Sequence, residues 1–124
     1  MPVRPEEIDQ MAKEFEACKG ILLALGDENR QRLILEMMRM EDCNGVRVGE
    51  ITARTHLSRP AVSHHIRILK EAGILNVRKD GTKNYYYFDV ETQTMDRLMR
   101  MIAHTRAIMA SMPDRSGNNM TGGI

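Results

Sequence analysis

Residues 51–73 read ITARTHLSRPAVSHHIRILKEAG, and this stretch decides the fold. It predicts two short helices joined by a tight turn. Ser58 stands where a helix N-cap belongs, and Pro60 falls in the first turn, where its missing backbone N–H has no cost. Gly73 is placed to end the helix. The sequence therefore predicts that the second helix begins after Ser58 and ends before Gly73.

This second predicted helix has two contrasting faces. Apolar residues recur at spacings of three and four, namely Ala61, Val62, Ile66 and Leu69. The remaining positions are mostly polar or basic: Arg59, Ser63, His64, Arg67 and Lys70. A short helix, a turn and a capped helix with such an outer face are typical of a helix-turn-helix, whose second helix enters the major groove of DNA.

The residues that follow predict a β-hairpin. Ile74, Leu75 and Val77 form a short β-prone run, and residues 85–88, YYYF, form an aromatic one. Between them, residues 78–83 read RKDGTK, whose Asp-Gly pair is a strong hairpin signal. The fold class we expect is mainly α with a small β-hairpin: a winged helix-turn-helix.

Charge is distributed unevenly along a chain whose net charge is only +1. Residues 54–83 carry seven Lys or Arg against two Asp or Glu, whereas residues 1–53 carry seven against eleven. The positive charge thus falls on the predicted helix-turn-helix and wing, where a protein would meet DNA phosphates. The alternative is an ordinary solvated charged face, which has no reason to coincide with a helix-turn-helix pattern.

The other segments predict three more helices and one short one. Apolar spacing indicates a helix over about 6–25, and Asp27 is suited to N-cap a second helix that reaches about residue 40. A turn over 41–45 leads into the first helix of the helix-turn-helix, within 46–55. The last helix is expected over about 91–111. We expect residues 1–112 to form one DNA-binding and dimerisation domain, and residues 113–124 to be a disordered tail.

The two end helices carry more apolar surface than a small winged domain can hide. We expect a homodimer through the N- and C-terminal helices, with a flexible methionine-rich seam on the last one. The residues predicted at this interface are Met95, Leu98, Met99, Ile102 and Met109. A two-fold dimer would place two recognition helices roughly 34 Å apart and read a near-palindrome.

Composition bounds the cellular context. The chain has 124 residues, no apolar run near the roughly 20 needed to span a membrane, and a polar first segment unlike a secretory signal. We expect a cytoplasmic protein with no membrane partner. Its two cysteines suggest free thiols before a disulfide framework.

Two segments carry a family resemblance. Residues 25–35, LGDENRQRLIL, resemble the "LGDPTRLRIL" opening of the ArsR family of bacterial repressors. Residues 57–75, LSRPAVSHHIRILKEAGIL, resemble that family's recognition helix, "LSQPTVSHHLKVLREAGLV". The match extends in register over about residues 20–110. It implies a dimeric winged-helix repressor that blocks promoter access and releases DNA on a signal, often a metal ion or an oxidant.

Carried over position by position, the resemblance implies a set of DNA-contacting residues. Those implied at the start of the helix and at base edges are Ser58, Arg59, Pro60, Ser63 and His64. Those implied at phosphates or flanks are His65, Arg67, Lys79 and Lys83, although His65 is equally suited to partial burial. Arg59 stands where the family often has Gln, and an Arg can grip guanine with two hydrogen bonds.

His56 also departs from the family, which commonly has Gly at the end of the first reader helix. That place suits a positive φ, which His adopts more readily than most residues other than Gly. We interpret His56 as structural.

The familiar metal sites of the family are not matched. Arg47 and Gly49 occupy the positions of its thiol pair, and in the last helix Asp96 is followed by Arg97 and Leu98 where an Asp-x-His is expected. His104 is the one histidine of that helix, and we expect it at the surface or interface. We therefore predict no metal and no cofactor, and release from DNA by an unidentified signal.

The cysteines leave one alternative open. Cys18 falls on the apolar side of the first helix, where packing is the simpler role, and Cys43 falls in a polar turn. A thiol-redox switch using Cys18 and Cys43 would need the two Cα atoms within about 6 Å.

Two other function classes fit less well. Ser63, His64 and His65 are neighbours in one helix and do not face each other, so we predict no enzyme. A winged helix that binds a protein and not DNA is the remaining alternative, and the basic segment argues against it.

Overall fold

A computed structural model describes residues 3–40, 44–91 and 93–117 of the chain. It contains five helices and one β-hairpin, and confirms the predicted winged helix-turn-helix. The elements follow in the order α1 (Pro5–Leu25), α2 (Glu28–Arg39), α3 (Val48–Thr52), α4 (Arg59–Glu71), β1 (Leu75–Asp80), β2 (Lys83–Phe88) and α5 (Thr94–Ser111).

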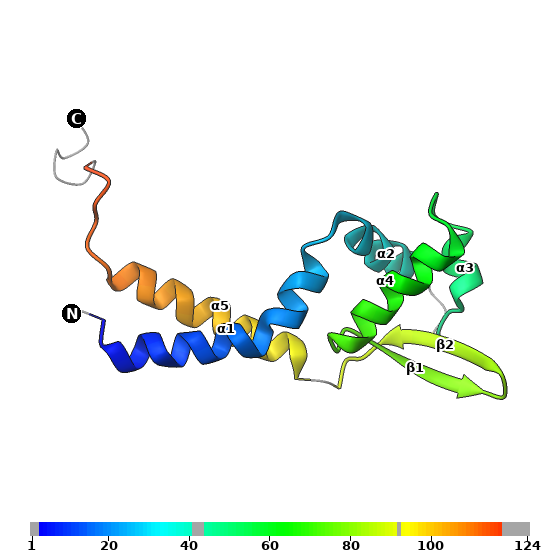
Figure 1. The fold of residues 1–124 in the computed structure, drawn as a ribbon, viewed down its shortest axis with the longest axis horizontal. Helices are drawn as coiled ribbons and strands as arrows, with labels where there is room; N and C mark the ends of the chain where they lie inside the picture. The colour runs from blue at the N-terminus through cyan, green and yellow to red at the C-terminus, as the bar shows by residue number, and fades with distance from the viewer. Residues whose placement is uncertain (1–2, 41–43, 92, 118–124) are drawn as a thin grey trace.

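The molecule has two parts along its length. Figure 1 shows α1 and α5 side by side at one end, running in opposite directions, while α2, α3, α4 and the hairpin form the other end. The α1–α5 pair buries Met11 and Cys18 from one helix and Met101 and Ile108 from the other. A polar contact joins the same helices, since the Nδ1 atom of His104 lies 2.7 Å from a carboxylate oxygen of Glu14.

The predicted caps of α2 and α4 are confirmed. The Asp27 carboxylate accepts a hydrogen bond from the Arg30 backbone N–H at 3.0 Å, which lowers the pKa of Asp27. The Ser58 hydroxyl accepts from the Ala61 backbone N–H at 3.3 Å. Each cap satisfies an N–H that the first turn of a helix leaves without a partner. Both helix starts are therefore set by local side-chain chemistry.

The end of α4 depends on Gly73. The N–H of Gly73 donates to the Lys70 carbonyl, and the N–H of Ile74 donates to the Leu69 carbonyl, both at 3.0 Å. This is the Schellman arrangement, which requires a left-handed residue, and Gly73 has φ +83°. The turn sends the chain directly from the recognition helix into the wing.

The first helix of the helix-turn-helix is shorter than predicted. The expected span was 46–55, but α3 begins at Val48. Val46 instead forms an isolated antiparallel bridge with Tyr86, through two hydrogen bonds of 2.9 and 2.8 Å. Pairing with the wing thus removes Val46 from the helix and ties the start of α3 to β2.

The wing is also longer than its apolar runs indicated. Leu75 pairs with Phe88 at its base and Asp80 with Lys83 at its tip, which leaves Gly81 and Thr82 as a two-residue loop. Gly81 has φ +64°, and no described residue other than glycine has a positive φ. A positive φ at the first loop residue alone is the pattern of a type II′ turn.

The core lies beneath α4. The largest fully buried side chains are Leu33, Ile51, Ile66, Leu69, Leu75 and Val62. They come from α2, α3, α4 and β1, and the partly buried Tyr86 and Phe88 of β2 pack against the same cluster. Packing against this cluster buries the apolar face of α4, and the opposite face of the helix is exposed to solvent.

The boundaries of the last helix and tail differ slightly from expectation. Helix α5 begins at Thr94, not at residue 91, and ends at Ser111. Residues 113–117 are exposed and form no helix or strand, and the rest of the predicted tail lies outside the described residues. In the part of the chain that the structure describes, no helix is both long and apolar enough to cross a membrane.

Substituting Gly73 by alanine tests the role of the α4 terminus. A Cβ at this position would lie 2.4 Å from the Thr94 hydroxyl oxygen and would also have to adopt the left-handed φ. We expect Gly73→Ala to lower the free energy of unfolding by about 1–3 kcal/mol, measured by urea denaturation. Gly20→Ala is the matched control, because that site is helical with open space around it. There we expect a gain of about 0.5–1 kcal/mol. Equal effects at the two sites would contradict this account of Gly73.

Candidate nucleic-acid interface

The outer face of α4 is exposed over its whole length. Val62, Ile66 and Leu69 point into the core. The exposed residues of the helix include Arg59, Pro60, Ser63, His64, Arg67 and Lys70. A recognition helix requires burial on one side and exposure on the other. Its outer side chains must reach base edges, while its inner side chains keep the helix packed on the core. The predicted base-contacting residues thus lie together on the exposed side of α4.

His64 and Arg67 are organised with respect to each other. The Nη2 atom of Arg67 lies 3.1 Å from Nδ1 of His64, one turn earlier on the same face. Because a guanidinium only donates hydrogen bonds, Nδ1 must accept this one. The hydrogen of the neutral ring is then on Nε2, so His64 offers an N–H donor at its outer edge. A base oxygen, a base N7 atom or a phosphate oxygen can accept from that donor.

His65 is placed differently from its neighbours. Its side chain is half-buried, and its Nδ1 atom lies 3.3 Å from Nη1 of Arg30 in α2. Partial burial is the main cause that lowers the pKa of His65 below its ordinary value of 6.5, and the Arg30 charge lowers it further against the opposing effect of Asp27. Of the two environments that the sequence left open for His65, the structure shows the partly buried one: the residue joins α4 to α2, and its phosphate contact stays a prediction.

Arg30 makes this junction a three-way one. Its Nε atom donates to the Ala24 carbonyl at 2.8 Å, and its Nη2 atom donates to the Leu23 carbonyl at 3.0 Å. One guanidinium thus satisfies carbonyls at the end of α1 while contacting His65 in α4. Sequence analysis missed this role, although Arg30 belongs to the segment that carried the family resemblance.

Two lysines of the wing are exposed near its tip, and one arginine contacts other residues of the protein. Lys79 and Lys83 are exposed close to the tip, on opposite strands. Arg78 instead donates to the Asn44 carbonyl at 2.6 Å, and its guanidinium lies 4.7 Å from the centre of the Tyr85 ring. Arg78 therefore anchors the wing to the segment before α3, and Lys79 and Lys83 are the wing cations placed to meet a polyanion.

Comparison with known proteins agrees with this architecture. The family described as "Bacterial regulatory protein, arsR family" matches residues 27–77, from the N-cap of α2 into β1. An uncharacterised HTH-type transcriptional regulator of Methanocaldococcus jannaschii is 36% identical over 75 residues, which are 60% of this chain and 81% of that protein. The chain belongs to the ArsR family of bacterial regulatory proteins.

Two further comparisons extend the match. The transcriptional activator HlyU of Vibrio cholerae is 28% identical over 99 residues, which are 79% of this chain and 88% of HlyU. The crystal structure of the ArsR family transcriptional regulator RHA00566 superposes with a TM-score of 0.61 at 19% identity, over 91% of this chain and all of that one. At that identity the superposition shows the fold alone. The family match and the named relatives show that the protein is a transcriptional regulator and not an enzyme.

One expectation about the helix-turn-helix turn was wrong. Where many ArsR proteins carry glycine, His56 was expected to adopt a positive φ. No described residue other than glycine has a positive φ, so the turn accommodates His56 with ordinary backbone geometry. His56 is exposed and lines a hollow together with Arg54 and Thr55.

The residues considered for sensing are dispersed. Cys18 is a buried free thiol of α1, as its packing role predicts. Cys43 lies outside the described residues. Within 3–40, 44–91 and 93–117, no three His, Cys, Asp or Glu side chains converge on a metal site. His104 has an unpredicted partner, Glu14, which is 90 residues away in sequence.

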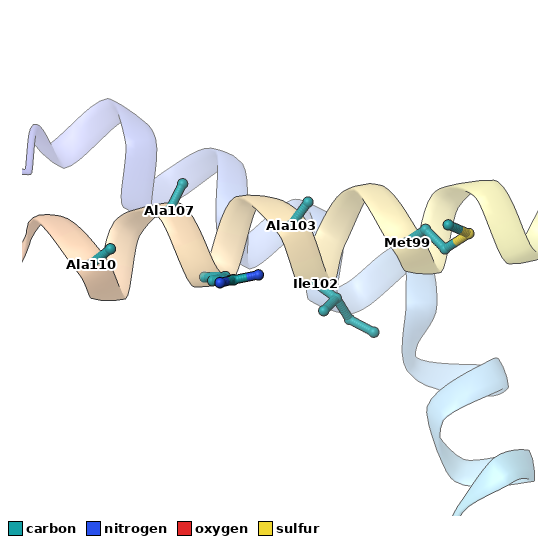
Figure 2. A pocket seen from close by; sticks show the side chains of 6 residues that line it. Met99, Ile102, Ala103, Ala107 and Ala110 are labelled. Atoms are coloured by element: carbon teal, nitrogen blue, oxygen red, sulfur yellow. The ribbon is translucent and has the colours of Figure 1, made fainter.

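The predicted interface residues divide between two faces of α5. Leu98 is 9% exposed and packs in the protein's own core, whereas Met99 is 67% exposed. Met95, Ile102 and Met109 are exposed with Met99. A groove on this outer side is lined by Met99, Ile102, Ala103, Arg106, Ala107 and Ala110, which Figure 2 shows spread along α5. Leu98 therefore packs within its own chain, and three alanines that the methionine pattern missed belong to the exposed face.

The burial of His65 predicts a pH-dependent stability. Because its pKa is lowered on folding, the unfolded chain binds more protons as the pH falls, and acid favours unfolding. The contribution of the neutral ring is present above the ordinary pKa of 6.5 and is lost as the pH falls through the lower folded value. We expect His65→Gln to reduce the loss of unfolding free energy between about pH 7.5 and pH 5.5, measured by urea denaturation. The exposed His56→Gln serves as control, and an identical reduction in both variants would contradict this assignment.

Proposed function

We propose that this ArsR-family protein is a homodimeric repressor that reads a near-palindromic operator with α4 and releases it on a signal. The observation that carries the proposal is the exposed polar face of α4. Its opposite face is buried in the core, and a basic wing follows it in the chain. Its residues match the chemistry of DNA: donors for base edges on the helix, and cations for phosphates on the wing. Seven basic against two acidic residues over 54–83 supply the attraction.

The proposed contacts differ in what they contribute. Arg59, Ser63 and His64 lie in the first part of α4, where a recognition helix meets base edges, and Arg59 is suited to guanine. Arg67, Lys79 and Lys83 would contact phosphates, which fixes the register of the protein without reading the sequence. Ser58 and Pro60 shape the helix start, so that these side chains enter the groove together.

The outer face of α5 supports assembly with a second copy of the chain. Ala103, Ala107 and Ala110 recur at spacings of four and three, so small side chains follow one side of the helix. Small residues allow another helix to approach closely, and the flanking Met99 and Ile102 side chains would be buried by it. Fully burying one such large side chain contributes about 1.5–3 kcal/mol.

Charge on the end helices supports the same assembly. Helix α1 contains five acidic residues and two lysines, whereas α5 contains three arginines and one aspartate. These helices already lie side by side within one chain, and a two-fold arrangement would bring the same opposite charges together between chains. Two copies of α4 would then lie about 34 Å apart, one turn of DNA, and would read related half-sites.

Repression is the proposed outcome because a bound dimer occupies DNA that a polymerase needs. HlyU, a relative, is named an activator, so activation is the competing outcome and transcription in vitro from a selected operator decides between them. The signal for release is not one held at the family's familiar metal sites, since Arg47 and Gly49 stand at the thiol positions.

The α4 face predicts a specific loss of operator binding. Operators are first selected from random duplexes with the full chain, and affinity is measured by fluorescence anisotropy over a range of salt concentrations. We expect Ser63→Ala combined with His64→Ala to weaken operator binding by about 1–3 kcal/mol per lost base contact, with little change for unrelated DNA. Lys83→Gln should instead weaken both DNAs and lower the salt dependence. Failure to select any duplex would favour a protein-binding winged helix, and normal operator affinity of the double variant would contradict the assigned reading face.

The α5 face predicts the oligomeric state. We expect the wild-type chain to sediment as a dimer at micromolar concentration. Met99→Glu combined with Ile102→Glu should give monomers that lose tight palindrome binding, since burying two carboxylates in an apolar interface is strongly unfavourable. Leu35→Glu is a matched control, because Leu35 is also exposed and apolar but lies on α2. A wild-type monomer, or dissociation by Leu35→Glu alone, would overturn the α5 interface.

A further inference from the structure

A second hollow lies beside the helix-turn-helix, away from the α5 face. It has a volume of about 280 Å³ and is bounded by α2 on one side and by residues 54–57 on the other. Those four residues form the segment between α3 and the N-cap of α4. None of the DNA contacts proposed above uses this hollow, although it adjoins the start of the recognition helix.

The hollow combines an apolar lining with a cationic rim. Leu35 and Leu57 supply its accessible apolar surface, and the fully buried Leu33 borders it. The charged residues that line it are Arg32, Arg39, Arg54 and Glu36, which leaves an excess of two positive charges. Small-molecule sites typically have this composition, in which an apolar wall is joined by a few placed polar groups.

The three arginines are not equivalent. Arg32 is paired with Glu28 at 2.7 Å, and Arg39 is paired with Glu36 at 2.6 Å. Within the described ranges, the guanidinium of Arg54 makes no hydrogen bond or ion pair with another residue. Arg54 therefore retains its full capacity for an anionic partner, and a guanidinium binds a carboxylate through two parallel hydrogen bonds.

We propose that this hollow binds a small organic carboxylate with an apolar body, held by Arg54 at its charged end and by Leu35 and Leu57 at its apolar end. This inference rests on the proposed DNA-binding function for its consequence, because a ligand there would act on operator affinity. Leu57 directly precedes Ser58, the N-cap of α4. A bound anion would also add negative charge next to the DNA-facing turn, so it would lower affinity for the operator.

Binding is tested on the full chain without DNA, so the result does not depend on whether the protein binds an operator. The probe is 2-naphthoate, followed through the leucine methyl signals in ¹H–¹³C correlation spectra. We expect saturable shifts at Leu33, Leu35 and Leu57, and much weaker binding of the neutral analogue 2-naphthylmethanol. Three outcomes would each overturn the proposal: no shifts at millimolar 2-naphthoate, equal binding of the neutral analogue, or shifts centred on Met99 and Ile102.

Variants assign the charged end of the site. Arg54→Gln should weaken 2-naphthoate binding roughly tenfold, since it removes a charge-assisted pair. Arg54→Lys should restore part of the affinity, and Arg100→Gln, an exposed arginine on α5, should have no effect. Equal weakening by Arg54→Gln and Arg100→Gln would show a non-specific charge effect and overturn the assignment.

The consequence for DNA is measured separately. Addition of 2-naphthoate should weaken operator binding by wild-type protein, and by less in Arg54→Gln. Ligand binding without any effect on operator affinity would overturn the regulatory part of the inference. It would leave the proposed operator binding unaffected.

Discussion

The structure depends on the burial of one side of α4. Val62, Ile66 and Leu69 are all at most 1% exposed, and they contact a core built from α2, α3 and β1. Their burial contributes about 1.5–3 kcal/mol for each side chain, which outweighs any single polar contact on the outer face. The outer face can therefore carry exposed polar residues such as Ser63 and His64, as the proposed DNA contacts require, without a cost to the fold.

Much of this arrangement could be predicted because its signals are local. The Ser58 and Asp27 caps, the Gly73 terminus and the alternating faces of α4 each depend on residues within one or two turns. What the sequence did not show depends on contacts between distant segments. Val46 lies outside α3 because it pairs with Tyr86, 40 residues away. The choice between the exposed and the partly buried environment of His65 depends on its contact with Arg30 in α2. No periodicity within either segment contains that information.

The end helices show a second limit of pattern analysis. Apolar residues occur on both sides of α5, so spacing alone groups Leu98 with Met99 although they occupy different environments. The position of α1 separates them: residues facing α1 complete the core, and residues on the outer side are exposed, as the proposed dimer requires. The pairing of Glu14 with His104 arises from the same packing. The likeness to the ArsR family indicated which residues to propose as DNA contacts, and the structure separated the exposed ones from the partly buried His65.

The central claim is that DNA meets the outer face of α4 and the tip of the wing. The most direct measurement is a map of backbone amide shifts when the full chain binds a selected operator duplex. The account predicts that the largest changes fall on residues 59–67 and 79–83, with Ser63 and His64 among them. Changes centred on α5, with α4 unaffected, would contradict it.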